Sequence, residues 1–95
     1  MVPRAGEDGV AKKIVYGDHA QEKYALLRRY GFVVSRRQVR ETVQKPEKVE
    51  AGYRGRKVAQ RGITERHVLR VVYEEGPEDI RIVTFYPGRR SRYES

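Results

Sequence analysis

The chain has 95 residues, of which 38% are hydrophobic and 36% charged, and its formal net charge is +8. This length fits one small domain, and the hydrophobic content suffices for a modest core, which argues against global disorder. The absence of cysteine excludes disulfides, thiolate catalysis and cysteine-based zinc sites. No apolar run reaches the roughly 20 residues of a membrane span, and no signal-peptide core is present, so we expect a soluble cytoplasmic protein.

The positive charge comes mainly from arginine, whose planar guanidinium matches the geometry of phosphate. Nucleic acid is therefore the partner class that the composition favours. The alternative is a salt-bridged, solvated surface in a protein of a thermophile. Residues 1–50 hold 11 basic and 7 acidic residues and residues 51–95 hold 10 and 6, so each half carries +4 and any basic patch must be formed by folding.

Residues 1–10 have little apolar content, two glycines and a proline, which predicts a mobile N-terminal lead-in. Residues 11–95 show no repeat or linker and are predicted to form a single α+β domain. The first element expected in it is a short edge strand from Lys12 to Tyr16. The open edge beside Ile14 leaves both a monomer and a homodimer compatible with the sequence.

A first helix is predicted after Gly17. Asp18 is well placed as its N-cap, because a carboxylate there can accept from free backbone N–H groups. Ala20, Tyr24 and Leu27 stand at i, i+4 and i+7 and mark the face that packs on the core. Gly31 suits the left-handed residue that ends a helix.

A second helix has a sharper start signal. Ser35 is its expected N-cap, and Gln38 three residues later completes a capping box. Val34 and Val39 occupy the two positions of a hydrophobic staple. Pro46 disfavours helical backbone at the residue before it and so ends the helix.

The remainder of the chain reads as strands separated by turns. Alternation and β-branched residues predict strands within residues 47–53, 57–61, 66–73 and 80–87, and the last two flank a Gly-Pro turn as a β-hairpin. The order is strand, helix, helix and four strands. An antiparallel sheet with the two N-terminal helices packed on one face satisfies this order with short connections.

The two faces of the closing hairpin carry different residues. Alternation assigns an apolar set to the face under the helices, namely His67, Leu69, Val71 and Tyr73. In the last strand, Val83 and Phe85 alternate with Thr84 and Tyr86, and both sets are half apolar, so periodicity leaves the facing open. Grouping the polar side chains favours Thr84 and Tyr86 on the open face with Arg70.

An open face of this composition suits an RNA backbone. Arginine and lysine contact phosphate, and tyrosine stacks on a base or donates from its hydroxyl. RNA cleavage needs no metal when the 2′-hydroxyl attacks the adjacent phosphate, provided that an acid, a base and cations are in place. The alternative is a row of solvated arginines and a rim tyrosine. The basic residues expected here are Arg56, Lys57, Arg61, Arg89, Arg90 and Arg92.

His19 lies beside a helix N-terminus, where the helix dipole disfavours the imidazolium and a neutral ring could act as a base. The alternative is a histidine that packs on the sheet and bonds a backbone carbonyl. His19 and His67 show no ligand spacing, so neither a metal site nor a cofactor is expected.

Several short segments along the chain form a pattern that is specific only when the segments are taken together. They are His19-Ala20, Arg29-Tyr30-Gly31-Phe32 with Ser35, Pro46-Glu47-Lys48-Val49, Gly55-Arg56-Lys57-Val58, Leu69-Arg70-Val71-Val72-Tyr73 and Val83-Thr84-Phe85-Tyr86-Pro87. Together they resemble a small prokaryotic family of uncharacterised domains that reads His-Ala, Arg-Gly-Ile-Ser and Thr-Val-Tyr-Pro. That family is similar in element order to the RelE/ParE-like toxins, which include the BrnT type. Phe32 stands where the family has a smaller aliphatic residue.

The resemblance implies a curved antiparallel sheet covered by two helices. It also implies a toxin of a toxin–antitoxin pair that cleaves messenger RNA on the ribosome and is held by an acidic antitoxin protein. Arg70 and Tyr86 match the catalytic basic and tyrosine residues of such ribonucleases, and His19 matches the family's His-Ala start. RelE relatives vary in their catalytic residues, and ParE relatives act on gyrase.

Two functions therefore remain as hypotheses. The first is a metal-independent endoribonuclease with Arg70, Tyr86 and His19 as catalytic residues. Its RNA contacts would be Arg56, Lys57, Arg61, Arg89 and Arg90. The second is a non-catalytic basic module that binds RNA or an acidic protein partner.

Overall fold

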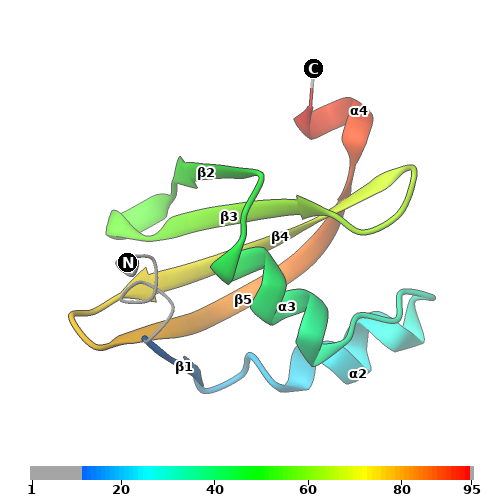
Figure 1. The fold of residues 1–95 in the computed structure, drawn as a ribbon. Coiled ribbons are helices and arrows are strands. Elements are labelled where there is room, and N and C mark those ends of the chain that lie inside the picture. Colours follow the sequence, from blue (N-terminus) through cyan, green and yellow to red (C-terminus); the bar gives the residue numbers. More distant parts are fainter. Residues whose placement is uncertain (1–11, 95) are drawn as a thin grey trace, which may run out of the picture.

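A computed structural model describes residues 12–94 of the chain, so the predicted lead-in at residues 1–10 lies outside the described residues. The structure confirms the α+β class and the order of strand, two helices and four strands (Figure 1). A short C-terminal helix that was not predicted follows the last strand. The elements are β1 (Lys13–Tyr16), α2 (Glu22–Arg29), α3 (Arg36–Gln44), β2 (Lys48–Ala51), η1 (Tyr53–Gly55), β3 (Lys57–Gly62), β4 (His67–Glu75), β5 (Asp79–Arg89) and α4 (Arg90–Tyr93).

The strands form one sheet in the order β1-β5-β4-β3-β2. The last four strands are an antiparallel meander, as predicted. The expectation of a wholly antiparallel sheet is wrong for β1, which pairs with β5 in parallel. A parallel pair needs a long crossover, and here all the intervening elements supply it. No turn joins β1 to β5, so the sequence contains no local signal for their relative direction.

The predicted stripe packs on the core: Leu27 of α2 is buried, Tyr24 is partly buried against the core, and Ala20 is buried in the turn that precedes the helix. The predicted N-cap of α2 is wrong: the helix begins at Glu22, after a turn, and Asp18 lies instead 3.9 Å from the Arg81 guanidinium. The predicted C-terminal glycine is confirmed, since Gly31 has φ of 91°. This left-handed residue lets the chain leave the helix without the strain that a Cβ would add.

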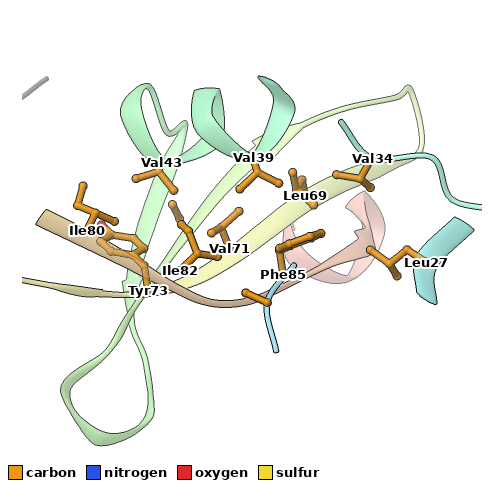
Figure 2. Close-up of a cluster of buried hydrophobic side chains, with 12 residues drawn as sticks. Leu27, Val34, Val39, Val43, Leu69, Val71, Tyr73, Ile80, Ile82 and Phe85 are labelled. Atoms are coloured by element: carbon orange, nitrogen blue, oxygen red, sulfur yellow. The ribbon is translucent and has the colours of Figure 1, made fainter. Parts of the chain in front are cut away.

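Helix α3 begins as the sequence predicts. The Gln38 N–H donates to Ser35 Oγ at 3.0 Å, and the Ser35 N–H donates to Gln38 Oε1 at 2.9 Å. A cap of this kind contributes about 1 kcal/mol. It orients α3 so that Val39 and Val43 lie buried against the sheet (Figure 2). Within residues 12–94, none of the helices has the length and apolar character needed to cross a membrane.

A β-bulge in β5 decides which side chains reach the core. Tyr73 pairs with Ile82 and Val72 with Thr84, so Val83 has no partner in β4. The extra residue reverses the alternation, and both Ile82 and Phe85 point into the core beneath the helices (Figure 2). Beyond the bulge, Thr84 shares the open face with Arg70, and Tyr86 lies directly opposite Arg70, as the polar grouping predicted.

Candidate nucleic-acid interface

Arg70 is the centre of a polar cluster on the open face of the sheet. Its side chain is 8% exposed. Its Nε donates to the Tyr86 hydroxyl at 3.1 Å, its Nη2 donates to Glu50 Oε1 at 2.9 Å, and its Nη1 donates to Gln60 Oε1. The ring of Tyr93 covers it, with the centroid 4.1 Å from the guanidinium carbon. We call these five residues the Arg70 cluster.

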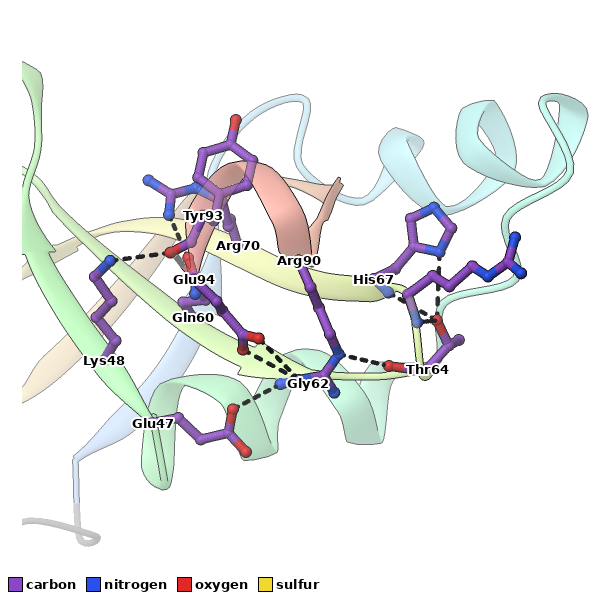
Figure 3. Close-up of polar contacts among 11 residues, drawn as sticks. Glu47, Lys48, Gln60, Gly62, Thr64, His67, Arg70, Arg90, Tyr93 and Glu94 are labelled. Atoms are coloured by element: carbon purple, nitrogen blue, oxygen red, sulfur yellow. Dashed lines mark hydrogen bonds and ion pairs between the residues drawn. The ribbon is translucent and has the colours of Figure 1, made fainter.

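Strand register brings most of this cluster together. Gln60 in β3 and Tyr86 in β5 both lie directly opposite Arg70 in β4, and residues opposite each other share a face of the sheet. Glu50 extends the cluster into β2. Tyr93 arrives from α4, which folds back over the open face (Figure 3).

Two glycines leave room for α4 in this position. A Cβ at Gly88 would overlap the Tyr93 ring, and a Cβ at Gly62 would overlap the Arg90 guanidinium. Arg90 secures the start of α4, because its N–H donates to the Arg66 carbonyl at 2.8 Å and its Nε donates to the Thr64 carbonyl at 3.0 Å (Figure 3). The docked position of α4 is thus specified by small residues as well as by hydrogen bonds.

The charge of Arg70 is balanced within the cluster. Burial alone would lower the pKa of Arg70, but the hydrogen bonds with Tyr86 and Glu50 outweigh it and raise the pKa. The hydrogen bond from Arg70 lowers the pKa of Glu50, and Lys48 lowers it further. Arg70 therefore stabilises the junction of β2, β3, β4 and β5, and its cation is not free for a ligand in this conformation.

A different set of arginines lies exposed on the surface. Arg66, Arg89 and Arg92 are exposed, and none has a carboxylate partner among residues 12–94. They lie where β4 begins and β5 ends, and we call them the arginine surface. A cavity of about 400 Å³ and another of about 560 Å³ open here, and Arg89 lines both. The first is lined by Glu65, Arg66, His67, Arg89, Arg90 and Ser91, and the second by Pro87, Gly88, Arg89, Arg92 and Tyr93.

The structure separates the basic residues that the sequence grouped. Arg56 pairs with Glu74 at 3.0 Å, and Lys57 pairs with Glu75 at 2.7 Å. Lys57 lies opposite Tyr73 while Arg89 lies opposite His67. The two groups are therefore about 20 Å apart along β4, at about 3.3 Å per residue.

Two further residues predicted to contact RNA instead form hydrogen bonds within the protein. Arg61 donates to the Lys45 carbonyl at 2.7 Å, and Arg90 binds Thr64 and Glu94. Among the five predicted RNA contacts, only Arg89 joins the arginine surface.

His19 lies away from the Arg70 cluster. Its imidazole is 85% exposed and its Nδ1 is 3.5 Å from Glu22 Oε1. It lines a groove of about 620 Å³ between α2 and β5, together with Val83 and Thr84. The structure thus brings Arg70 and Tyr86 together without His19. Residues 12–94 contain no group of three or more His, Asp or Glu side chains placed to hold a metal ion.

Sequence reasoning missed the residues that decide how Arg70 behaves. Gln60 carried a usable signal, because it is an uncharged polar residue next to Ala59 within the strand predicted at residues 57–61. No sequence signal indicated the position of Tyr93, since the last predicted strand ends at residue 87. Arg66 was not among the predicted RNA contacts, because its position beside Arg89 depends on the register of β4 and β5.

Comparison of the chain with protein-family models, with curated proteins and with solved structures gives no match in any of the three.

Proposed function

We propose that this protein binds RNA through the arginine surface and does so without cutting it. The observation that supports the proposal is the convergence of Arg66, Arg89 and Arg92 around two adjoining cavities, with no carboxylate partner among residues 12–94. Guanidinium groups bind phosphate in a bidentate manner, and three of them at one site fit a phosphate backbone. The net charge of +8 adds long-range attraction for a polyanion.

Aromatic groups beside the arginines favour RNA over an acidic protein. Tyr93 lines the same cavity as Arg89 and Arg92, and His67 lines the cavity of Arg66. Unpaired bases stack on such rings and on guanidinium planes, whereas the carboxylates of a protein partner need only the cations. We therefore expect single-stranded RNA to bind better than a duplex.

The contacts of the Arg70 cluster argue against catalysis. A transition-state phosphate needs donors that point at it and are not already paired. Arg70 donates to three partners, carries Glu50 as its counter-ion and lies under Tyr93. With α4 docked, no phosphate reaches the Arg70 guanidinium.

A second candidate function is the metal-independent endoribonuclease of a toxin–antitoxin pair, acting on the ribosome. One observation favours it: a cation and a phenol lie side by side on the open face, with Arg70 Nε 3.1 Å from the Tyr86 hydroxyl. Such a pair could stabilise charge and transfer a proton to a leaving oxygen. The small α+β fold with a mixed five-stranded sheet is compatible with a RelE/ParE-like protein. This function requires α4 to leave Arg70.

The binding proposal is tested with fluorescently labelled single-stranded RNA and two triple variants. R66A/R89A/R92A removes the arginine surface, and R56A/K57A/R61A removes an equal charge from paired residues as the matched control. We expect the first variant to lose affinity by about tenfold or more, since each cation contributes by releasing counter-ions from phosphate. Equal losses in the two variants would contradict the proposal.

Cleavage is tested on the same RNA, with and without ribosomes and in the presence of EDTA. Intact RNA under all these conditions is the expected result. Cleavage that survives EDTA and is lost in R70K and Y86F would establish the nuclease as the function instead.

A further inference from the structure

We propose that two copies of this chain associate through the free edges of their β2 strands, in an antiparallel register centred on Val49. The inference concerns self-assembly and does not depend on RNA binding. It follows from the direction of the backbone groups in β2, from the side chains on its edge and from the order of its charges.

The outer edge of β2 has backbone groups to share. The Gly52 N–H donates to the Arg56 carbonyl at 2.6 Å, toward β3. Because direction alternates along a strand, Glu50 and Lys48 also point their backbone groups toward β3, and Val49 and Ala51 point theirs outward. No strand within residues 12–94 lies on that side, since β2 ends the sheet.

The side chains on this edge are apolar and exposed. Val49 is 48% exposed and Tyr53 is 76% exposed, and Ala51 between them is exposed as well. Val49 lies opposite the fully buried Ala59, so this row continues the helix-covered face beyond α3. The opposite edge, β1, has no large hydrophobic residue among those most exposed, so the self-pairing edge is β2 and not the Ile14 strand.

The charges of β2 select the partner and the register. Lys48 and Glu50 lie on one face of the strand, with Lys48 Nζ 3.0 Å from Glu50 Oε2. When Val49 faces Val49 of a second copy, each Lys48 faces the Glu50 of the other chain. A register shifted so that Val49 faces Ala51 would place the two Glu50 carboxylates opposite each other, and like charges in that position destabilise a strand pair. The strand is thus complementary to itself in one register.

This pairing joins two five-stranded sheets into one continuous sheet. The two-fold axis of an antiparallel pair stands perpendicular to the sheet, so both open faces lie on the same side. A single pair of short strands forms a small interface, and the dimer is therefore weak and concentration-dependent.

Disulfide trapping tests the register directly, because the chain has no native cysteine. Val49→Cys places two thiols across the two-fold axis, with Cα atoms about 5.5 Å apart, within the range that a disulfide bridges. Tyr53→Cys is the matched control: it is more exposed, but its two copies would lie about 26 Å apart. We expect a disulfide-linked dimer with V49C and none with Y53C. No dimer with V49C, or equal dimer with both, overturns the proposal.

Sedimentation over a series of concentrations gives an independent test. The average mass of the unmodified protein should rise with concentration. Val49→Pro should abolish this rise, because proline removes an N–H that points outward and leaves the bonds between β2 and β3 in place. Circular dichroism shows whether V49P keeps its fold. A monomeric mass at every concentration, or an unchanged rise in folded V49P, contradicts the pairing.

Discussion

Arg70 and Arg89 lie on the same β-hairpin, three residue pairs apart, yet their surroundings are opposite. Arg70 is buried and donates to Tyr86, Glu50 and Gln60. Arg89 is exposed, lines two cavities and has no ion pair within residues 12–94. Arg70 therefore contributes to stability and Arg89 is available to a ligand. The number of cations on a surface says little about binding until their internal partners are known.

The largest effect should come from removing the buried cation. Arg70→Met leaves Glu50, Gln60 and Tyr86 without their shared donor, and a side chain of similar length still fills the space. We expect a loss of about 2–3 kcal/mol in the free energy of unfolding, measured by urea denaturation, because loss of one partner leaves buried polar groups unpaired.

Arg89→Met is the matched control for this contrast. It should change the free energy of unfolding by about 0.5 kcal/mol or less, as expected for an exposed side chain that forms no ion pair with residues 12–94. Similar losses in the free energy of unfolding of R70M and R89M would show that Arg70 contributes no more to stability than Arg89.

The sequence predicted the helices well because their signals are local. The capping box of Ser35 and Gln38 needs only four residues, and Gly31 marks the end of α2 by its own backbone preference. The prediction of Asp18 as N-cap is wrong because the chain forms a turn first, and the helix begins at Glu22.

The Arg70 cluster could be predicted only in part, because its members meet through tertiary contacts. Polarity was enough to place Tyr86 beside Arg70. The bulge at Val83 reverses the alternation of β5 side chains between the two faces of the sheet, and no sequence pattern indicated the bulge. The position of Tyr93 depends on the folding back of α4, and two glycines far apart in the chain make that possible.

An intermediate loss of stability is expected for Gly88→Ala. This variant should expose Arg70 and so reduce the difference in exposure between Arg70 and Arg89. The added Cβ overlaps the Tyr93 ring, so α4 should detach at a cost of about 1 kcal/mol, in line with overpacking. Hydrogen exchange should quicken at the amides of Arg90 and Glu94, which bond the Arg66 and Arg90 carbonyls. The amide of Val71 in the core should stay protected. Unchanged exchange at Arg90 would mean that Gly88 is not needed for docking.

The smallest change in stability is expected at the other end of the hairpin, where Lys12 and Lys57 pair with Glu75. Hydrogen bonds from Lys12 at 2.6 Å and Lys57 at 2.7 Å lower the pKa of Glu75 from 4.5 to about 2. A lowered pKa in the folded state stabilises the fold above pH 4.5, and this contribution is lost as the pH falls toward 2. Glu75→Gln should therefore be less stable at pH 7 and should lose less stability on acidification than the unmodified protein.

Glu78→Gln serves as the control for the acid titration, since no described residue forms an ion pair with Glu78. Its stability between pH 7 and pH 2 should run parallel to that of the unmodified protein. A Glu75→Gln curve that also runs parallel would indicate that Lys12 and Lys57 are not held by Glu75 and are free to bind a ligand.

The salt dependence of RNA affinity shows how many phosphate contacts the arginine surface makes. For a single strand, the slope of log K against log salt concentration changes by about 0.7 for each phosphate contact, so R66A/R89A/R92A should reduce the slope by about 2. R56A/K57A/R61A should keep the slope of the unmodified protein, because its cations are already held by carboxylates or a backbone carbonyl. An unchanged slope in the first variant together with a reduced slope in the second would contradict the account.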